Sequence, residues 1–101
     1  YTTLFRSGFS PGKARSLSFA VSETTPYVAF SDEANGEKAT VMKFDGTDWI
    51  FVGGAGITEN IADEVSLAIE NDVLWLAFQD AAHDSKVTVI KNGGNGWAVV
   101  G

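Results

Sequence analysis

Short apolar runs alternate with turn residues along the whole chain. The runs are four to seven residues long and rich in Val, Phe, Trp and Ile, which favour β-strands. Asn35-Gly36 and Asp45-Gly46 separate neighbouring runs, and both dipeptides suit tight hairpin turns because their residues tolerate positive φ. Helical spacing is weak, and only residues 59–70 show it loosely. The pattern therefore predicts an all-β chain.

The chain repeats itself at an offset of 48 residues. Residues 38–53 read KATVMKFDGTDWIFVG and residues 86–101 read KVTVIKNGGNGWAVVG, with eight of the sixteen positions identical. Residues 27–32 match residues 75–80 at the same offset. Self-similarity of this kind predicts two structural units built on the same plan.

The match is less regular in the first strand of each unit. Residues 16–19 (SLSF) resemble residues 66–69 (SLAI) at an offset of 50 rather than 48. This alignment predicts that the second unit has gained two residues in the loop before the strand and lost two in the turn after it, since loops tolerate insertions. It also argues against a helix over residues 59–70, because that segment aligns with a strand.

The apolar runs and turn residues of each unit predict four antiparallel strands joined by short turns. In the first unit they cover residues 16–21, 26–32, 39–44 and 49–53, and in the second unit they cover residues 66–70, 74–80, 87–92 and 97–101. A four-stranded meander that repeats every ~40–50 residues is typical of a propeller blade.

The strand sequences resemble bacterial β-propeller repeats with SLA-[IF], YVAF-x-D, TV-x-K and W-x-x-VG signatures. The resemblance covers nearly the whole chain. It implies a single domain over residues 1–101, in which blade 1 covers residues 6–53 and blade 2 covers residues 54–101. It implies no particular activity, because propellers include enzymes, lectins and scaffolds alike.

Two blades alone would expose a large apolar surface. A blade inside a propeller packs on both faces, so its central strands are apolar on both sides, as residues 28–30 and 74–78 are. The two outer faces of a two-blade chain stay bare, which soluble monomers seldom tolerate. We therefore expect copies to associate head to tail and complete a β-propeller. Because known propellers have about four to eight blades, a trimer is favoured over a dimer or a tetramer.

The first residues add a further strand candidate. Residues 1–4 align with residues 49–52 at the offset of 48, so residues 1–5 form an extra segment like the fourth strand of a unit. One interpretation is a strand exchanged between copies. The other is a strand left over from a longer propeller, of which this chain is a piece.

Composition excludes several classes of partner. The net charge is −6 and the seven Lys and Arg residues are scattered, so no nucleic acid is expected. No run reaches the ~20 apolar residues of a membrane helix, so no membrane is expected. Without cysteine the chain cannot form the common structural zinc sites, and we expect neither a metal nor a cofactor. The chain is expected to be soluble, and its compartment stays open, with secretion or the periplasm among the alternatives.

Four residues at matching positions are candidate ligand-binding residues. Asp32 and Asp80 end the second strand of each unit. They could act as a carboxylate pair, hold a cation, or accept hydrogen bonds from N–H groups of the following turn. Tyr27 and Trp75 could stack on a sugar, or pack in a core or interface as most aromatic residues do. Recurrence in both units favours the structural alternative for the two aspartates.

No arrangement of residues indicates catalysis. His83 is the single histidine and lies in a loop beside Asp84, but no motif places a Ser or Cys nucleophile near it. A solvated loop histidine is the simpler interpretation. The sequence therefore names no catalytic and no metal-binding residue.

The loops before the first strand of each unit carry opposite charges. Lys13 and Arg15 lie in the first loop, and Glu59, Asp63 and Glu64 lie in its counterpart. In a ring of identical copies these loops would alternate in sign around one face. We expect the basic loop to face the acidic loop of an adjacent blade and to guide assembly. The alternatives are a charged pocket at the channel mouth and loops that are simply solvated.

These patterns favour a non-enzymatic, self-assembling β-propeller that binds a ligand or acts as a scaffold, with the chain itself as its partner. A carbohydrate or another small molecule is the candidate ligand, because repeated pockets suit multivalent binding. One alternative is an enzyme whose site forms where copies meet at the central axis. Another is a two-blade piece of a larger secreted propeller protein.

Overall fold

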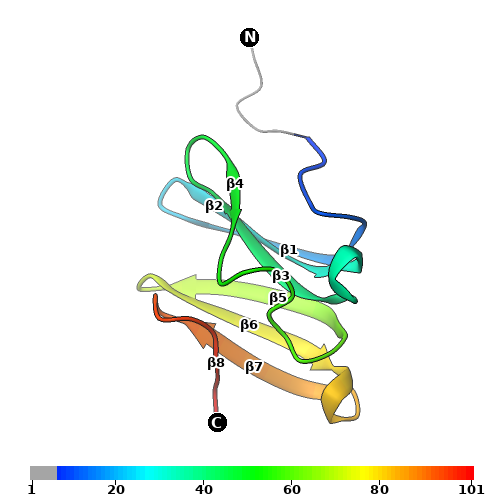
Figure 1. The fold of residues 1–101 in the computed structure, drawn as a ribbon. Helices are drawn as coiled ribbons and strands as arrows, with labels where there is room; N and C mark the ends of the chain where they lie inside the picture. The colour runs from blue at the N-terminus through cyan, green and yellow to red at the C-terminus, as the bar shows by residue number, and fades with distance from the viewer. Residues whose placement is uncertain (1–6) are drawn as a thin grey trace.

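The computed structural model describes residues 7–101, which form eight strands. The strands make two four-stranded antiparallel sheets that follow one another along the chain (Figure 1). Sheet 1 contains β1 (Ala14–Ser22), β2 (Thr25–Asp32), β3 (Lys38–Phe44) and β4 (Trp49–Phe51), in that order. Sheet 2 contains β5 (Ala62–Glu70), β6 (Val73–Asp80), β7 (Lys86–Asn92) and β8 (Ala98–Val99), also in that order.

The prediction of an all-β chain with two four-stranded meanders is confirmed. The segment with loose helical spacing, residues 59–70, contains the strand β5 and no helix. The extra strand expected over residues 1–5 lies outside the described residues.

The two sheets match at a constant offset of 48 residues. Ser18 pairs with Ala29 in sheet 1, and Ser66 pairs with Ala77 in sheet 2. The offset of 50 expected for the first strand is therefore wrong, and neither the preceding loop nor the following turn differs in length between the units. Positions 48 residues apart are called equivalent below.

A β-bulge in the first strand of each sheet explains this error. The pairing register shifts between Arg15 and Ser18, and it shifts at the equivalent place in sheet 2. Ser16 and Glu64 take the left-handed conformation there, with φ of 55° and 51°. A bulge leaves one residue out of the ladder. Ser16-Leu17 lies within the bulge of β1, whereas Ser66-Leu67 follows the bulge of β5, so these matching dipeptides are not at equivalent positions.

The core lies between the two sheets. Its buried residues are Ala29, Ala39, Val41, Ala62, Val65, Leu67, Leu74, Leu76, Phe78 and Ile90. β5 lies beside β1 and also contacts β2 and β3. Buried positions alternate along β6 at Leu74, Leu76 and Phe78, so among residues 7–101 sheet 2 buries only one of its faces.

Residues 52–61, here called the connection, lead from sheet 1 to sheet 2 along the edge of β3. The Val52 N–H donates to the Val41 carbonyl at 2.8 Å, and the Ile57 N–H donates to the Ala39 carbonyl at 2.7 Å. The indole N–H of Trp97, just before β8, donates to the Val52 carbonyl at 2.9 Å. Hydrogen bonds thus tie this connection to both sheets.

Substitution of Gly53 tests how closely the connection packs on sheet 2. A Cβ at Gly53 would lie 2.5 Å from Cδ1 of Trp97, and the φ of Gly53 is +82°. Gly54 has a φ of +89° with no atom within 4 Å of its Cβ position, which makes it the matched control. We expect Gly54→Ala to lower the free energy of unfolding by about 1–2 kcal/mol through backbone strain. Gly53→Ala should cost about 1–3 kcal/mol more, because the indole must move. Urea unfolding measures both losses, and equal losses would contradict this packing.

Candidate functional site

The contact between β1 and β5 shows how this chain covers the face of a sheet. Val65 and Leu67 on β5 are each 7% exposed and belong to the core between the sheets. Their N–H groups donate to the hydroxyls of Ser16 and Ser18 on β1, both at 2.9 Å. Sheet 1 therefore covers the apolar side chains of β5 and also supplies acceptors for its backbone.

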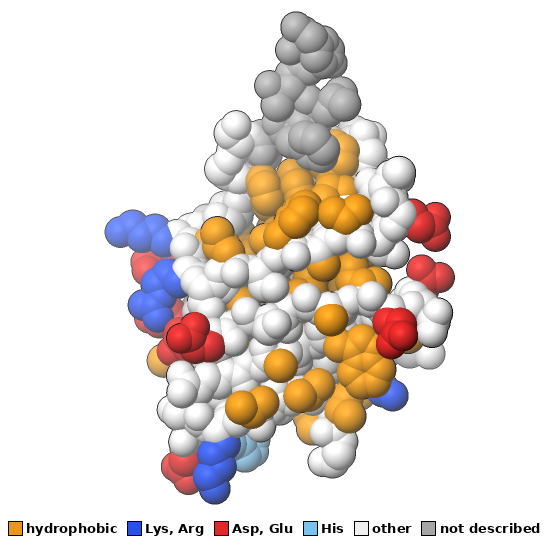
Figure 2. Space-filling view, turned by 180° about the vertical axis from the view of Figure 1, so that it is seen from behind, with side chains coloured by type: hydrophobic (Ala, Val, Ile, Leu, Met, Phe, Trp, Pro, Cys, Tyr) orange, Lys and Arg blue, Asp and Glu red, His pale blue; other side chains and the backbone are white. Residues whose placement is uncertain are grey.

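The equivalent face of sheet 1 is exposed. Leu17, Phe19 and Val21 on β1 are 67%, 63% and 53% exposed, although they are equivalent to the β5 side chains that pack against sheet 1. Figure 2 shows hydrophobic side chains gathered at the surface over both halves of the molecule. Neighbouring exposed apolar residues of this size mark an interaction surface more often than isolated ones do.

The outer face of sheet 2 is exposed in the same way. Val87 is 75% exposed, whereas the equivalent Ala39 in sheet 1 is 0% exposed. Trp75 on β6 has Nζ of Lys91 at 5.4 Å from its ring centroid, a cation–π distance, while the equivalent Tyr27 packs against the core. One face of each sheet is thus open in residues 7–101. The open face of sheet 1 is equivalent to the face of sheet 2 that is buried in the core, and the open face of sheet 2 is equivalent to the face of sheet 1 that covers it.

Arg15 connects the two sheets near the start of their first strands. Its guanidinium lies 3.1 Å from a carboxylate oxygen of Asp63 in sheet 2 and 3.3 Å from one of Glu37. The expected placement in loops is wrong for this pair, because Arg15 lies in β1 and Asp63 in β5, where the β-bulges lengthen each strand at its start. Because all three side chains are more than a third exposed, each pair contributes about 0–1 kcal/mol to stability. Their expected role in guiding assembly between copies stays a prediction.

The other three charged residues of this group, of which Glu64 lies in β5, make no ion pair within residues 7–101. Lys13, Glu59 and Glu64 are all exposed. The backbone of Lys13 is fixed nevertheless, because its carbonyl accepts a hydrogen bond from the Glu33 N–H at 3.0 Å. Of these five residues, the fold therefore brings together Arg15 and Asp63.

Asp32 holds the turn that follows β2. This turn is a short 3₁₀ segment, η1 (Glu33–Asn35), and the Ala34 N–H donates to the Asp32 carboxylate at 3.2 Å. The side-chain amide of Asn35 donates to it at 2.8 Å, and the Thr40 hydroxyl donates at 2.7 Å. The carboxylate is fully buried, and these three donors provide the partners that a buried charge needs.

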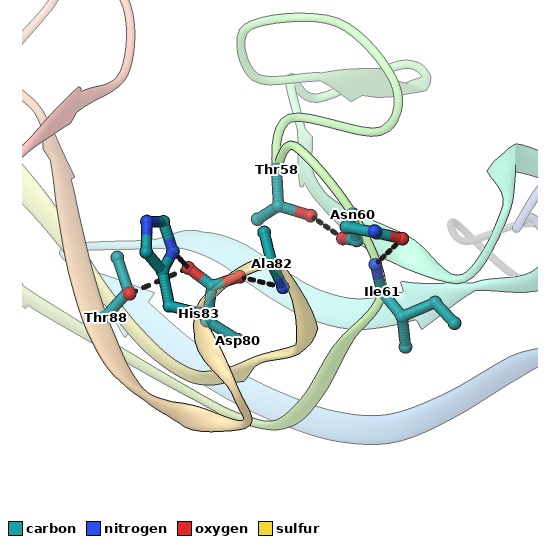
Figure 3. Close-up of polar contacts among 7 residues, drawn as sticks. All are labelled: Thr58, Asn60, Ile61, Asp80, Ala82, His83 and Thr88. Carbon is teal, nitrogen blue, oxygen red and sulfur yellow. Dashed lines mark hydrogen bonds and ion pairs between the residues drawn. The ribbon is translucent and has the colours of Figure 1, made fainter.

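Asp80 does the same for the turn after β6, with a histidine in place of the asparagine (Figure 3). In the segment η2 (Ala81–His83) the Ala82 N–H donates to the carboxylate at 3.0 Å. Nδ1 of His83 lies 2.8 Å from the carboxylate, and the Thr88 hydroxyl donates to it at 2.8 Å. His83 therefore occupies the structural position that Asn35 has in sheet 1.

The Asp80–His83 pair changes the pKa of both groups. Burial is the largest influence on Asp80 and raises its pKa, but the hydrogen bonds from Thr88, His83 and Ala82 together outweigh burial, so the net pKa is lowered from 3.8. The pKa of His83 is raised above its ordinary value of 6.5, first by the hydrogen bond to Asp80 and then by the charge of that carboxylate.

The four candidate ligand-binding residues do not form one site. Tyr27 and Trp75 lie near the starts of β2 and β6, whereas Asp32 and Asp80 end these strands. Both carboxylates are buried, and each accepts hydrogen bonds from its own turn and from a threonine on the next strand. This geometry supports the structural alternative for the aspartates.

Sequence reasoning missed the contact formed by β1. Its signal is the strict alternation over residues 16–21, where serine or alanine alternates with Leu17, Phe19 and Val21. A period of two indicates a strand with two different faces. The same pattern does not say which face has a neighbour.

Within residues 7–101 no group of three or more acidic, His or Cys side chains could hold a metal ion. In the same residues no helix has the length and apolar character needed to cross a membrane. No family model, curated protein or solved structure matches the chain.

The His83–Asp80 pair should make stability depend on pH. Because the pKa of His83 is raised in the folded chain, its contribution is fully present below pH 6.5 and is lost as the pH rises through the raised value. We expect the urea midpoint of the wild type to fall over this window. His83→Asn keeps a donor to Asp80, as Asn35 does for Asp32, and should remove this fall. Measurement above pH 5 keeps the titration of Asp80 out of the comparison, and identical profiles for the two proteins would contradict the assignment.

Proposed function

We propose that this chain is a non-enzymatic, self-assembling module whose two sheets act as blades of a β-propeller built from several copies. The observation that carries the proposal is a difference in exposure at equivalent positions. Phe19 on β1 is 63% exposed, whereas Leu67 on β5 is 7% exposed. The two strands have the same pairing register within their sheets. Among residues 7–101, however, only the apolar side chains of β5 are covered by another sheet.

The outer face of sheet 2 in another copy suits the exposed face of β1. Inside the chain, sheet 1 covers β5 with a face that includes Ala29 and Ala39. The equivalent residues of sheet 2 are Ala77 and Val87, which are also small or β-branched. Packing this face on β1 of the next copy repeats the internal contact. Burial of each exposed Leu, Phe or Val side chain contributes about 1.5–3 kcal/mol.

Polar groups match at the same contact. Ser66 would accept a hydrogen bond from the Phe19 N–H of the next copy, as the equivalent pair does inside the chain. Asp63 would meet Arg15 of the next copy, which repeats the internal ion pair with the two charges exchanged. This agreement supports association in one defined register.

The proposed contact is head to tail, because it joins different faces of the two copies. Contacts of this type form a ring where the rotation closes, and a trimer with six blades is the ring we favour. A closed ring presents each surface loop several times at fixed spacing, which suits multivalent binding. A carbohydrate remains the candidate ligand.

Phe19→Glu should abolish assembly. We expect the wild type to show about three times the mass of one chain by light scattering, and the variant to show the mass of one chain, because a carboxylate in an apolar contact is strongly unfavourable. Thr24→Glu adds the same charge in the exposed turn after β1 and should leave assembly intact. A wild type that is monomeric and stably folded at micromolar concentration would overturn the proposal.

The charges at the contact should tune its strength. Arg15→Asp should raise the dissociation constant of the assembly up to about fivefold at low salt, and the effect should fade at high salt. Adding Asp63→Arg should recover most of the affinity. Lys13→Asp makes the same change in net charge at a residue without an ion pair in residues 7–101, so it is the control. Equal effects of the two single variants would show that net charge, and not the pair, is responsible.

A further inference from the structure

The connection between the sheets fills the edge of sheet 1 beyond the short strand β4. The Gly56 N–H donates to the Thr40 hydroxyl at 2.9 Å, and the Ile57 N–H donates to the Ala39 carbonyl at 2.7 Å. In return, the Ala39 N–H donates to the Thr58 hydroxyl at 3.0 Å. Ala39 and Thr40 are 0% exposed. The N–H and carbonyl groups of Ala39 and the hydroxyl of Thr40 therefore all have hydrogen-bond partners in the connection.

The equivalent place in sheet 2 is an open groove of about 520 Å³ along β7, here called the β7 groove. It is lined by Val87 and Thr88, which are equivalent to Ala39 and Thr40, and by His83 among others. No segment among residues 7–101 occupies it as the connection occupies the edge of β3. The high exposure of Val87 reflects this empty groove together with the open outer face of sheet 2.

Residues 7–10 have the backbone needed to fill the β7 groove. They are equivalent to residues 55–58 of the connection. Gly8 has a φ of +59°, and Gly56 has a φ of +64°. The left-handed conformation at this point, which glycine adopts readily, is thus already present in the N-terminal segment.

The hydroxyl of Ser10 is also oriented as in the connection. It donates to the Gly12 carbonyl at 2.6 Å, and the Thr58 hydroxyl donates to the Asn60 carbonyl at 2.8 Å. Since a hydroxyl that donates can still accept, Ser10 is ready to accept an N–H, as Thr58 does in sheet 1.

We infer that residues 7–10 of one copy bind in the β7 groove of the neighbouring copy. The Gly8 N–H would donate to the Thr88 hydroxyl, and the Phe9 N–H would donate to the Val87 carbonyl. The Val87 N–H would donate to the Ser10 hydroxyl. The inference rests on the proposed function and deepens it, because the neighbour then supplies a hydrogen-bonded edge as well as an apolar face.

Engineered disulfides test the inference, because the chain contains no cysteine. In sheet 1 a Cβ at Gly56 would lie 3.6 Å from Cβ of Lys38, a distance suited to a disulfide. The equivalent pair across two copies is Gly8→Cys with Lys86→Cys. On oxidation we expect this variant to form covalent multimers on a non-reducing gel.

Two controls frame this result. Gly56→Cys with Lys38→Cys should form the bond inside one chain without multimers, under the same backbone strain. Gly8→Cys with Asn95→Cys should not cross-link, because Asn95 lies in the exposed turn between β7 and β8. A monomer band from the Gly8–Lys86 variant, beside a formed bond in the Gly56–Lys38 control, overturns the inference.

Hydrogen exchange of the unmodified chain gives a second test that needs no cysteine. The Val87 amide should be protected in the assembled wild type. Ser10→Ala should speed its exchange about tenfold, the loss expected for one hydrogen bond, while Ser7→Ala should not. Rapid exchange of the Val87 amide in an intact wild-type assembly overturns the inference and leaves the proposed function standing. A wild type without assembly overturns both.

Discussion

The packing of β5 on sheet 1 holds the two halves of the chain together. It buries Val65 and Leu67 and gives their N–H groups hydroxyl acceptors on β1. Apolar burial supplies the driving force, which has no direction, and the two serine contacts fix the register. With the sheets held in this register, the connection forms its hydrogen bonds to β3, and the indole of Trp97 forms its hydrogen bond to the connection. The open faces of both sheets are what remains when this contact occurs only once.

The repeat allowed the sheets and their strands to be predicted, because strand propensity and hairpin dipeptides are local properties of the sequence. The bulge in β1 could not be predicted in this way, since residue identity does not report the positive φ at Ser16 or Glu64. The opposite charges indicated that the basic segment would face the acidic one, but they did not single out Arg15 and Asp63 as the pair. The contrast between Phe19 and Leu67 could not be predicted, because both fit the same alternating pattern and their exposure depends on a neighbouring sheet.

The aspartate turns show how much variation the repeated plan accepts. Asn35 and His83 are chemically different, yet each bonds the buried carboxylate of its turn at 2.8 Å. The carboxylate also accepts from a threonine on the next strand, Thr40 or Thr88. A buried charge with several fixed donors is costly to rearrange. The η1 turn therefore fixes the start of β3, along which the connection runs, and the η2 turn fixes the start of β7, along which the β7 groove runs.

Arg15 and Asp63 occupy equivalent positions with opposite charges. Where the two kinds of unit alternate, every junction brings a cation to an anion. A circle made from one kind of unit would instead set arginine against arginine or aspartate against aspartate, and like charges repel. An odd number of units would leave at least one such mismatch. In the proposed ring these two side chains would therefore favour an even number of units, which is the number that whole two-unit chains supply.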